Sequence, residues 1–166
     1  MYHIDDIVVY GTDGVCQISD ITELRFGKDS VEYYVLAPIG KKEDAVYVPT
    51  KNEQVLKRMR PVLSKAEAEA LLAKMPADPL PWIVNERERA QQYKDILLHG
   101  TSEDVLVMTR TLYLHQIEQL EKGKKLHSSD ERFLKDAERM LFDELAYVFG
   151  ITPQEVLPLI IKHREK

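Results

Sequence analysis

Cysteine is almost absent from this chain of 166 residues, in which Cys16 is the only one. A single cysteine cannot form an internal disulfide, and it cannot build a thiolate metal cluster. Cys16 lies in a stretch of alternating apolar residues, where a free cysteine usually serves as a small buried side chain. The sequence therefore predicts no disulfide and no cysteine-based metal site, and it places Cys16 in a core.

Long hydrophobic runs are missing as well. No apolar stretch approaches the roughly 20 residues that a membrane-spanning helix needs. The N-terminal residues Met1–Asp6 carry acids where a signal peptide carries bases. Apolar residues make up 44% of the chain and charged residues 31%, which is typical of a soluble globular protein. We therefore expect a cytoplasmic protein that does not associate with membranes.

An excess of positive charge is also lacking, because the formal net charge is −5. Non-specific affinity for DNA comes mostly from neutralising phosphates with basic side chains. The charge therefore argues against a protein that binds DNA strongly by itself. Any DNA contact is expected to be local and to depend on a partner.

Catalytic motifs are absent from the sequence. There is no Walker loop, no GxGxxG and no HExxH, and none of the five histidines forms an i,i+4 pair. His115 with Glu118, and Asp143 with Glu144, are expected to lie on solvated helix faces. The sequence predicts no enzyme activity, no cofactor, no metal and no small-molecule substrate.

The first 50 residues have the pattern of short strands. Val, Ile and Tyr are concentrated in runs that are separated by glycine-containing turns at Gly11–Gly14 and Gly27–Asp29. Strands of this length and spacing favour a small, strongly bent sheet or barrel. The expected strands begin near Ile7, Val15, Val31 and Ala45, and Ile21–Leu24 continues the pattern that starts at Val15.

From residue 52 onward the apolar period becomes helical. Capping boxes at Ser64–Glu67, Ser128–Glu131 and Thr152–Glu155 predict three helix starts, and Thr101 or Ser102 predicts another. Gly100 is predicted to end one of the helices, and Gly123 and Gly150 to end two others. We expect an all-α region of about five helices.

A proline-containing elbow interrupts this helical region. The segment Met75–Pro81 contains three prolines and cannot form regular helix. Trp82 follows it directly, and a helix is expected from there to His99. Because prolines precede Trp82, its side chain is a candidate for an exposed wedge or stacking group. The alternative is that this only tryptophan anchors the junction between the two parts of the chain.

These elements, in this order, resemble the CarD/CdnL family of bacterial transcription regulators over nearly the whole chain. The resemblance rests on Ile7–Tyr10 with Gly14 and Val15, Glu32–Leu36, Val46–Pro49, Trp82 with Arg87–Arg89 and Tyr93–Lys94, and Leu126, Ser128, Glu131, Leu134, Ala137, Leu141 and Glu144–Ala146.

The resemblance implies that the N-terminal part is a Tudor-like module that binds the RNA polymerase β subunit. In the family, the polymerase-facing surface uses the last strands of this module. Here that surface would comprise Val46, Tyr47, Val48 and Pro49, with Arg25 nearby. Some family members carry an arginine where this chain has Tyr47. An aromatic side chain can replace that contact but cannot replace the charge, and Tyr47 could instead simply cover the barrel.

The resemblance also implies that the helical part contacts promoter DNA. In the family, a tryptophan is placed at the upstream edge of the transcription bubble and stabilises the open promoter complex. Trp82 would be that residue, and Arg87, Arg89 and Lys94 would contact phosphates beside it. Glu86 and Glu88 alternate with the basic residues, so a solvated face of mixed charge is the alternative.

Together, the sequence predicts an α+β protein with a Tudor/SH3-like β-barrel over residues 1–60 and a compact helical domain over residues 61–166. The expected partners are the RNA polymerase β subunit and, weakly and mainly within the polymerase complex, promoter DNA. The competing hypothesis is a stand-alone Tudor-like interaction module, in which the helices are a scaffold with no DNA role.

Overall fold

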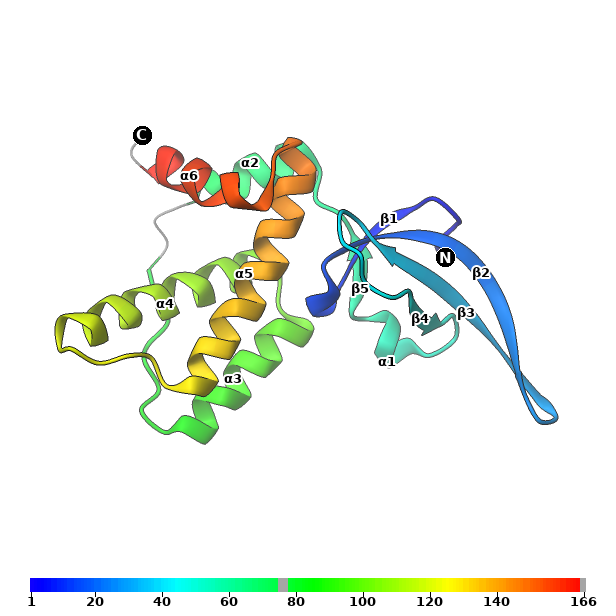
Figure 1. Ribbon diagram of the computed structural model, residues 1–166, viewed down its shortest axis with the longest axis horizontal. Coiled ribbons are helices and arrows are strands. Elements are labelled where there is room, and N and C mark those ends of the chain that lie inside the picture. Colours follow the sequence, from blue (N-terminus) through cyan, green and yellow to red (C-terminus); the bar gives the residue numbers. More distant parts are fainter. Residues whose placement is uncertain (75–77, 165–166) are drawn as a thin grey trace. The chain divides into compact units, whose positions relative to one another are not determined.

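Two compact units make up the computed structural model, which describes residues 1–74 and 78–164. The first unit comprises Met1–Val62 and the second Leu63–Lys166. The first consists mainly of strands and the second of helices (Figure 1). This confirms the predicted α+β class, with a Tudor-like sheet followed by helices.

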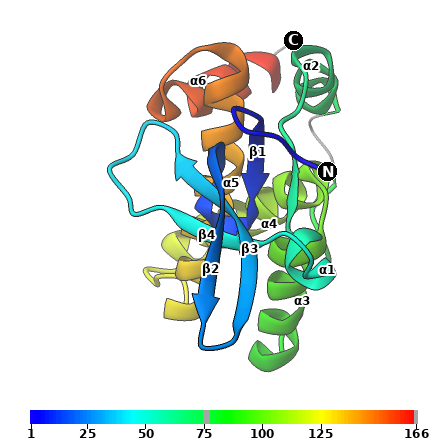
Figure 2. The same ribbon diagram turned by 90° about the vertical axis from the view of Figure 1, so that its right-hand side faces the viewer.

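The N-terminal unit is an antiparallel sheet whose strand order is β4-β3-β2-β1-β5. Strands β2 and β3 form a long hairpin that extends beyond the other strands of the unit (Figures 1 and 2). Gly27 at its tip has a φ of 65°, a left-handed conformation that glycine adopts without steric cost. The elements are β1 (Ile7–Tyr10), the 3-10 turn η1 (Gly11–Asp13), β2 (Val15–Phe26), β3 (Asp29–Pro38), β4 (Val46–Pro49), helix α1 (Glu53–Leu56) and β5 (Met59–Pro61).

The predicted continuation of the strand pattern at Ile21 is confirmed, because β2 is one continuous strand with only an irregularity in the pairing between Ile18 and Asp20. One feature of this sheet differs from the sequence prediction. Strand β5 was not predicted, because three residues ending in proline carry too short a pattern to recognise. It exists because Val8, Val9 and Tyr10 of β1 pair with it from a distant part of the chain.

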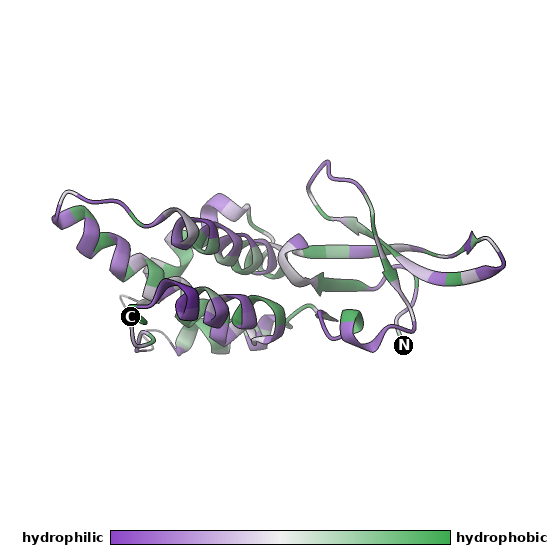
Figure 3. Ribbon diagram, turned by 90° about the horizontal axis from the view of Figure 1, so that it is seen from below, coloured by the Kyte–Doolittle hydropathy of each residue, from purple (hydrophilic) through white to green (hydrophobic). Residues whose placement is uncertain are grey.

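The core of the sheet unit is formed by side chains that alternate inward along the strands. Cys16 is completely buried there, as predicted, with Val8, Ile18, Leu36 and Val48. Hydrophobic and hydrophilic residues alternate along the hairpin beyond this core (Figure 3). The small core therefore lies at the base of the hairpin.

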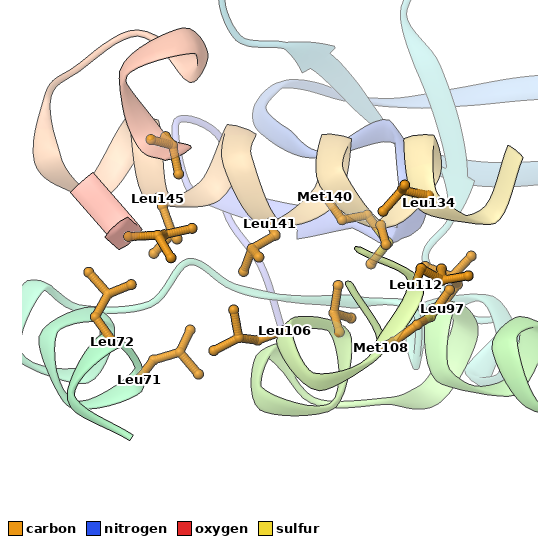
Figure 4. Close-up of a cluster of buried hydrophobic side chains, with 14 of the residues drawn as sticks. Leu71, Leu72, Leu97, Leu106, Met108, Leu112, Leu134, Met140, Leu141 and Leu145 are labelled. Atoms are coloured by element: carbon orange, nitrogen blue, oxygen red, sulfur yellow. The ribbon is translucent and has the colours of Figure 1, made fainter. Parts of the chain in front are cut away.

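The C-terminal unit contains five helices within its described residues, and α5 contacts each of the other four. Leucine and methionine side chains from these helices meet in one core (Figure 4). The helices are α2 (Lys65–Ala73), α3 (Glu86–His99), α4 (Ser102–Glu121), α5 (Ser128–Phe149) and α6 (Pro153–Arg164).

Most of the predicted helix boundaries are confirmed. Ser64 caps α2 with a complete capping box, in which its hydroxyl accepts from the Glu67 N–H at 3.1 Å. Thr101 caps α4 in the same way. Gly100 ends α3 with an ordinary φ of −74°, and a Cβ at this position would lie 2.5 Å from the Ile96 carbonyl oxygen.

The capping box predicted at Ser128–Glu131 is wrong. The N-cap residue of α5 is His127, without a side-chain capping bond, and Ser128 is already inside the helix. Asp130, the helix's third residue, is 3% exposed and binds a side chain from α3. The local signal was therefore outweighed by a contact between residues far apart in sequence.

Glu144 is also placed differently from the prediction, because it is 1% exposed and does not lie on a solvated face. Its carboxylate accepts hydrogen bonds from the Leu63 N–H at 3.1 Å and from the Ser102 hydroxyl at 3.2 Å. These bonds connect α5 with the start of the unit and with the first turn of α4. Burying a carboxylate costs free energy, and these hydrogen bonds offset that cost.

The predicted elbow is described from Asp78 onward, since Met75–Ala77 lie outside the described residues. Residues 78–84 form no regular secondary structure. Helix α3 begins at Glu86 with Asn85 as its N-cap, and so it does not start directly after Trp82. In the part of the chain that the structure describes, no helix is long and apolar enough to cross a membrane, and no cluster of three or more His, Cys, Asp or Glu side chains could hold a metal ion.

Candidate functional site

Strand β4 lies at one edge of the sheet, where it pairs with β3. The Thr50 N–H donates to the Glu32 carbonyl at 3.0 Å, which makes these two residues a hydrogen-bonded pair. Hydrogen-bonded pairs alternate with non-bonded pairs in an antiparallel ladder. Tyr47, which is opposite Val35, therefore directs its N–H and carbonyl away from β3 and toward the edge of the sheet.

The side chains of β4 divide between the core and the surface. Val48 is completely buried, and its pair with Tyr34 is a hydrogen-bonded one, so its N–H and carbonyl point toward β3 and not toward the edge of the sheet. Tyr47 is 51% exposed, and its ring makes an edge-to-face contact with Tyr33 at 6.2 Å between centroids. Val46 and Pro49 are partly buried. Tyr47 is therefore the residue of this strand that offers both side chain and main chain to a partner.

Arg25 lies near the tip of the hairpin and is not on the same face of the sheet as Tyr47. It pairs with Ser30 of β3, whereas Tyr47 pairs with Val35. Directly opposite residues share a face, and neighbours along a strand alternate. The structure therefore does not bring Arg25 and Tyr47 together on one surface, contrary to the predicted arrangement.

The face that contains Tyr47 also contains apolar side chains of the hairpin that the sequence analysis did not select. Leu24 is 38% exposed and Phe26 57% exposed. Their partners Val31 and Asp29 lie two and four residues before Tyr33 on β3, so the register puts them on one face with Tyr33. The sequence signal for this apolar face was the alternation of apolar and polar residues along β2, which continues to the tip of the hairpin.

Trp82 is partly buried and packs against the core of the helical unit, which is intermediate between the exposed wedge and the buried anchor that the sequence left as alternatives. Its ring stacks on the His115 imidazole, with 3.6 Å between centroids and 13° between planes. The guanidinium carbon of Arg89 lies 4.6 Å from the indole centroid. His115, which was expected on a solvated face, is therefore a direct neighbour of the candidate DNA-contacting residue.

Arg89 is 6% exposed and forms a bidentate ion pair with the buried carboxylate of Asp130. Its Nε and Nη2 donate to the two carboxylate oxygens at 2.8 Å each. Its Nη1 donates to the carbonyls of Ile83 at 2.9 Å and Val84 at 3.3 Å. The prediction that Arg89 contacts DNA phosphate is corrected by this geometry, because the guanidinium is enclosed and already bound.

Tyr93 belongs to the same buried group. It is 1% exposed and makes an edge-to-face contact with Phe133 at 5.7 Å between centroids. Burial, reinforced by the Asp130 carboxylate and opposed by Arg89, raises the pKa of Tyr93 to about 12. The phenol therefore stays neutral beside the ion pair at physiological pH.

Arg87 and Lys94 are exposed, as a contact with phosphate requires. They are seven residues apart on α3 and so lie on the same side of the helix. Glu86, which precedes Arg87, lies 3.2 Å from the His127 imidazole and accepts from the Ser129 hydroxyl at 3.2 Å. The two exposed basic residues stay candidates for a DNA contact.

Comparison with known proteins gives two findings. Residues 2–63, which span the sheet unit, match the CarD-like/TRCF RID domain. The sheet unit of this chain therefore contains a CarD-like/TRCF RID domain. A relative from Bacillus subtilis (strain 168), described as "Putative transcription factor YdeB", is 24% identical over 166 residues, and the match covers 94% of this chain and 97% of the relative.

The matched domain family implies interaction with RNA polymerase, and the description of the relative concerns transcription. The particular residues that contact polymerase or DNA stay predictions.

Sequence reasoning missed three participants of the tryptophan site. His115 was missed because no motif surrounds it. Asp130 was missed because it lies within the pattern Ser128–Glu131, which was interpreted as a capping box. Val84, beside the elbow, is 87% exposed. For Arg89 a signal did exist, because it precedes the buried Tyr93 and Leu97 at intervals of four residues, the spacing of one helix face.

Proposed function

We propose that this CarD-like protein binds the RNA polymerase β subunit through the edge of β4 and contacts promoter DNA through the region around Trp82. Contact near the upstream edge of the transcription bubble would stabilise the open promoter complex. The observation that carries this proposal is the match of residues 2–63 to the RID domain, combined with an edge strand at the position that the resemblance assigns to polymerase.

The geometry of β4 supports a main-chain mode of binding. An edge strand can add to a partner's sheet through its unpaired N–H and carbonyl groups, while exposed side chains supply specificity. Tyr47 has the required direction of main-chain groups and an exposed ring. A neutral aromatic at this position makes binding less dependent on salt than a charged residue would.

The net charge of −5 is compatible with a DNA role under this proposal, because polymerase supplies most of the affinity. A tethered domain experiences a high effective concentration of its second binding site. Exposed basic residues such as Arg87 and Lys94 can then act without a strongly basic protein.

A pair of substitutions at one position tests the main-chain contact. Tyr47→Ala removes the ring and keeps the N–H, whereas Tyr47→Pro also removes the N–H. Because this N–H does not point toward β3, the β3–β4 ladder should survive both substitutions. We expect Tyr47→Pro to bind the isolated β subunit at least tenfold more weakly than Tyr47→Ala, a difference of about 1.4 kcal/mol.

Titration calorimetry with thermal melting of both variants makes this measurement. Equal affinities of the two variants, with both folded, would rule out an edge-strand contact at Tyr47. Wild-type affinity in both variants would show that Tyr47 and the edge of β4 are not part of the interface. Introducing a carboxylate offers a second comparison, since Tyr47→Glu should weaken binding more than the charge reversal Arg25→Glu.

A further inference from the structure

The segment from Leu80 to Val84 is fixed to two helices. The Leu80 N–H donates to the Thr111 hydroxyl of α4 at 2.9 Å. His115, which stacks on Trp82, lies one helical turn after Thr111, so both residues are on one face of α4. On the other side of Trp82, Arg89 of α3 holds the carbonyls of Ile83 and Val84. The backbone on both sides of Trp82 is therefore bound to the helices.

Both faces of the indole are covered by protein. The imidazole of His115 lies parallel to the ring at 3.6 Å, which is van der Waals contact over one face. The guanidinium carbon of Arg89, at 4.6 Å from the indole centroid, would collide with this imidazole if it were on the same face. It therefore lies over the opposite face, and the three side chains form a layered His115–Trp82–Arg89 stack.

The two outer layers of the stack are themselves held. Arg89 is bound in a bidentate pair to buried Asp130. The His115 Nε2 lies 3.2 Å from the Gln119 side-chain nitrogen, and its Nδ1 lies 3.7 Å from the Glu118 carboxylate. Neither outer layer can move away without losing polar contacts. The Arg89 layer is the harder to displace, since doing so would leave Asp130 buried without its partner.

We propose that His115 and Arg89 are positioning residues, which hold the Trp82 indole rigidly so that it meets DNA with its edge and not with a stacking face. This inference rests on the proposed DNA contact of Trp82. A base could stack on the indole only after His115 or Arg89 had left. An indole edge held in one orientation can instead act as a wedge at a distorted base step.

The benefit of such positioning is entropic. A side chain that is already ordered before binding loses less rotamer freedom when it contacts DNA. Removing one layer should therefore weaken the DNA contact even though His115 itself touches no DNA. If the stack instead hid the indole from a base, removing His115 would strengthen the contact. The sign of the effect thus separates the two roles.

The test uses the full-length protein with polymerase and promoter DNA, and it measures the lifetime of the open complex. His115→Ala removes one layer, and His115→Phe restores an aromatic layer. His99→Ala is the matched control, because His99 is an exposed histidine at the end of α3. We expect His115→Ala to shorten the lifetime roughly two- to tenfold, and His115→Phe and His99→Ala to leave it near the wild-type value.

A second readout reports on the stack without DNA. Trp82 is the only tryptophan of the chain, so its fluorescence is specific to this site. His115→Ala should increase quenching by acrylamide and lower the fluorescence anisotropy, whereas His115→Phe and His99→Ala should not. Unchanged quenching in His115→Ala would show that His115 does not hold the indole and would overturn the proposal. Thermal melting confirms that all variants are folded.

Trp82→Ala separates failure of this inference from failure of the proposed function. If Trp82→Ala leaves the lifetime unchanged, the DNA contact of Trp82 is wrong and its positioning falls with it. If Trp82→Ala shortens the lifetime but His115→Ala does not, or lengthens it, the DNA contact stands and only the positioning role is refuted.

Discussion

At the scale of single residues, the Arg89–Asp130 pair buries two opposite charges inside the helical unit. Both residues are almost completely buried, at 6% and 3% exposure. Burying two charges is costly, and the attraction between them repays the cost only when geometry and additional hydrogen bonds are good. Two bonds of 2.8 Å and two backbone carbonyls meet this requirement.

Arg89→Ala is therefore expected to lower the free energy of unfolding by roughly 3–5 kcal/mol, because Asp130 would be left buried without a partner. Arg87→Ala, which removes an exposed arginine two residues earlier on α3, should change it by less than about 0.5 kcal/mol. Urea denaturation of both variants makes the comparison. Equal stabilities would mean that Arg89 is not a structural residue and would return it to the candidates for DNA contact.

The buried phenol of Tyr93 predicts a loss of stability in alkali. Its pKa is raised to about 12 in the folded protein from the ordinary value of 10. Below pH 10 the phenol is protonated in both states, so it does not affect the pH dependence. Between pH 10 and 12 the unfolded chain loses the proton first, and stability falls by up to about 1.4 kcal/mol per pH unit.

Tyr93→Phe tests this assignment, since it keeps the ring and removes the titrating group. Its free energy of unfolding should decline less steeply between pH 10 and 12 than that of the wild type, in denaturation curves measured at several pH values. Burial and the hydrogen bond to Glu138 also raise the pKa of Tyr113, so some decline is expected to persist. An unchanged slope in Tyr93→Phe would contradict the raised pKa.

At the scale of elements, helix starts in this chain follow local signals except where a long-range contact competes. Ser64 forms its capping box with Glu67 on an exposed surface. The similar pattern at Ser128 forms no capping bond. Asp130, an acidic residue in the first turn of α5, forms an ion pair with Arg89 instead. Two similar sequences thus have different roles because only one of them faces a buried partner.

Ser64→Ala and Ser128→Ala should accordingly differ in effect. Loss of an N-cap costs about 1 kcal/mol, and Ser64→Ala should reach that value. Ser128→Ala should be close to neutral, because Ser128 lies inside the helix and is exposed. Chemical denaturation resolves a difference of this size. A cost at Ser128 equal to that at Ser64 would show that α5 is capped by Ser128 in solution.

At the scale of the whole molecule, each unit has its own hydrophobic core, which favours separate binding functions for the two units. Residues 1–62 alone should bind the β subunit, and residues 63–166 alone should not. A two-hybrid assay or a titration with each fragment checks this, and circular dichroism verifies folding. Polymerase binding by the helical fragment only would reverse the proposed roles of the units.

The charge of the complete chain leads to a separate expectation. With a net charge of −5, the free protein should bind random duplex DNA only weakly at physiological salt. Fluorescence anisotropy with a labelled duplex measures this directly. A nanomolar dissociation constant for the isolated protein would show that tethering by polymerase is not needed for the DNA contact.

The sequence by itself determined the features that depend on neighbouring residues. The change of period from two to 3.6 separates strands from helices, and Ser64, Gly100 and Gly150 mark helix boundaries that the structure confirms. Tyr47 was selected from the family resemblance, and Trp82 from that resemblance together with the prolines before it; neither was selected from periodicity. Local patterns suffice for boundaries because caps and turns are formed by residues a few positions apart.

Only the tertiary structure decided which polar groups are buried and with whom they pair. Arg89 meets Asp130 across 41 residues, Glu144 meets Leu63 across 81, and β5 exists because β1 lies beside it. The same packing turned Trp82 from a predicted exposed wedge into the middle layer of a stack. A buried charge is stable only beside its partner, and that partner is set by how the helices pack, which no local pattern of this sequence specifies.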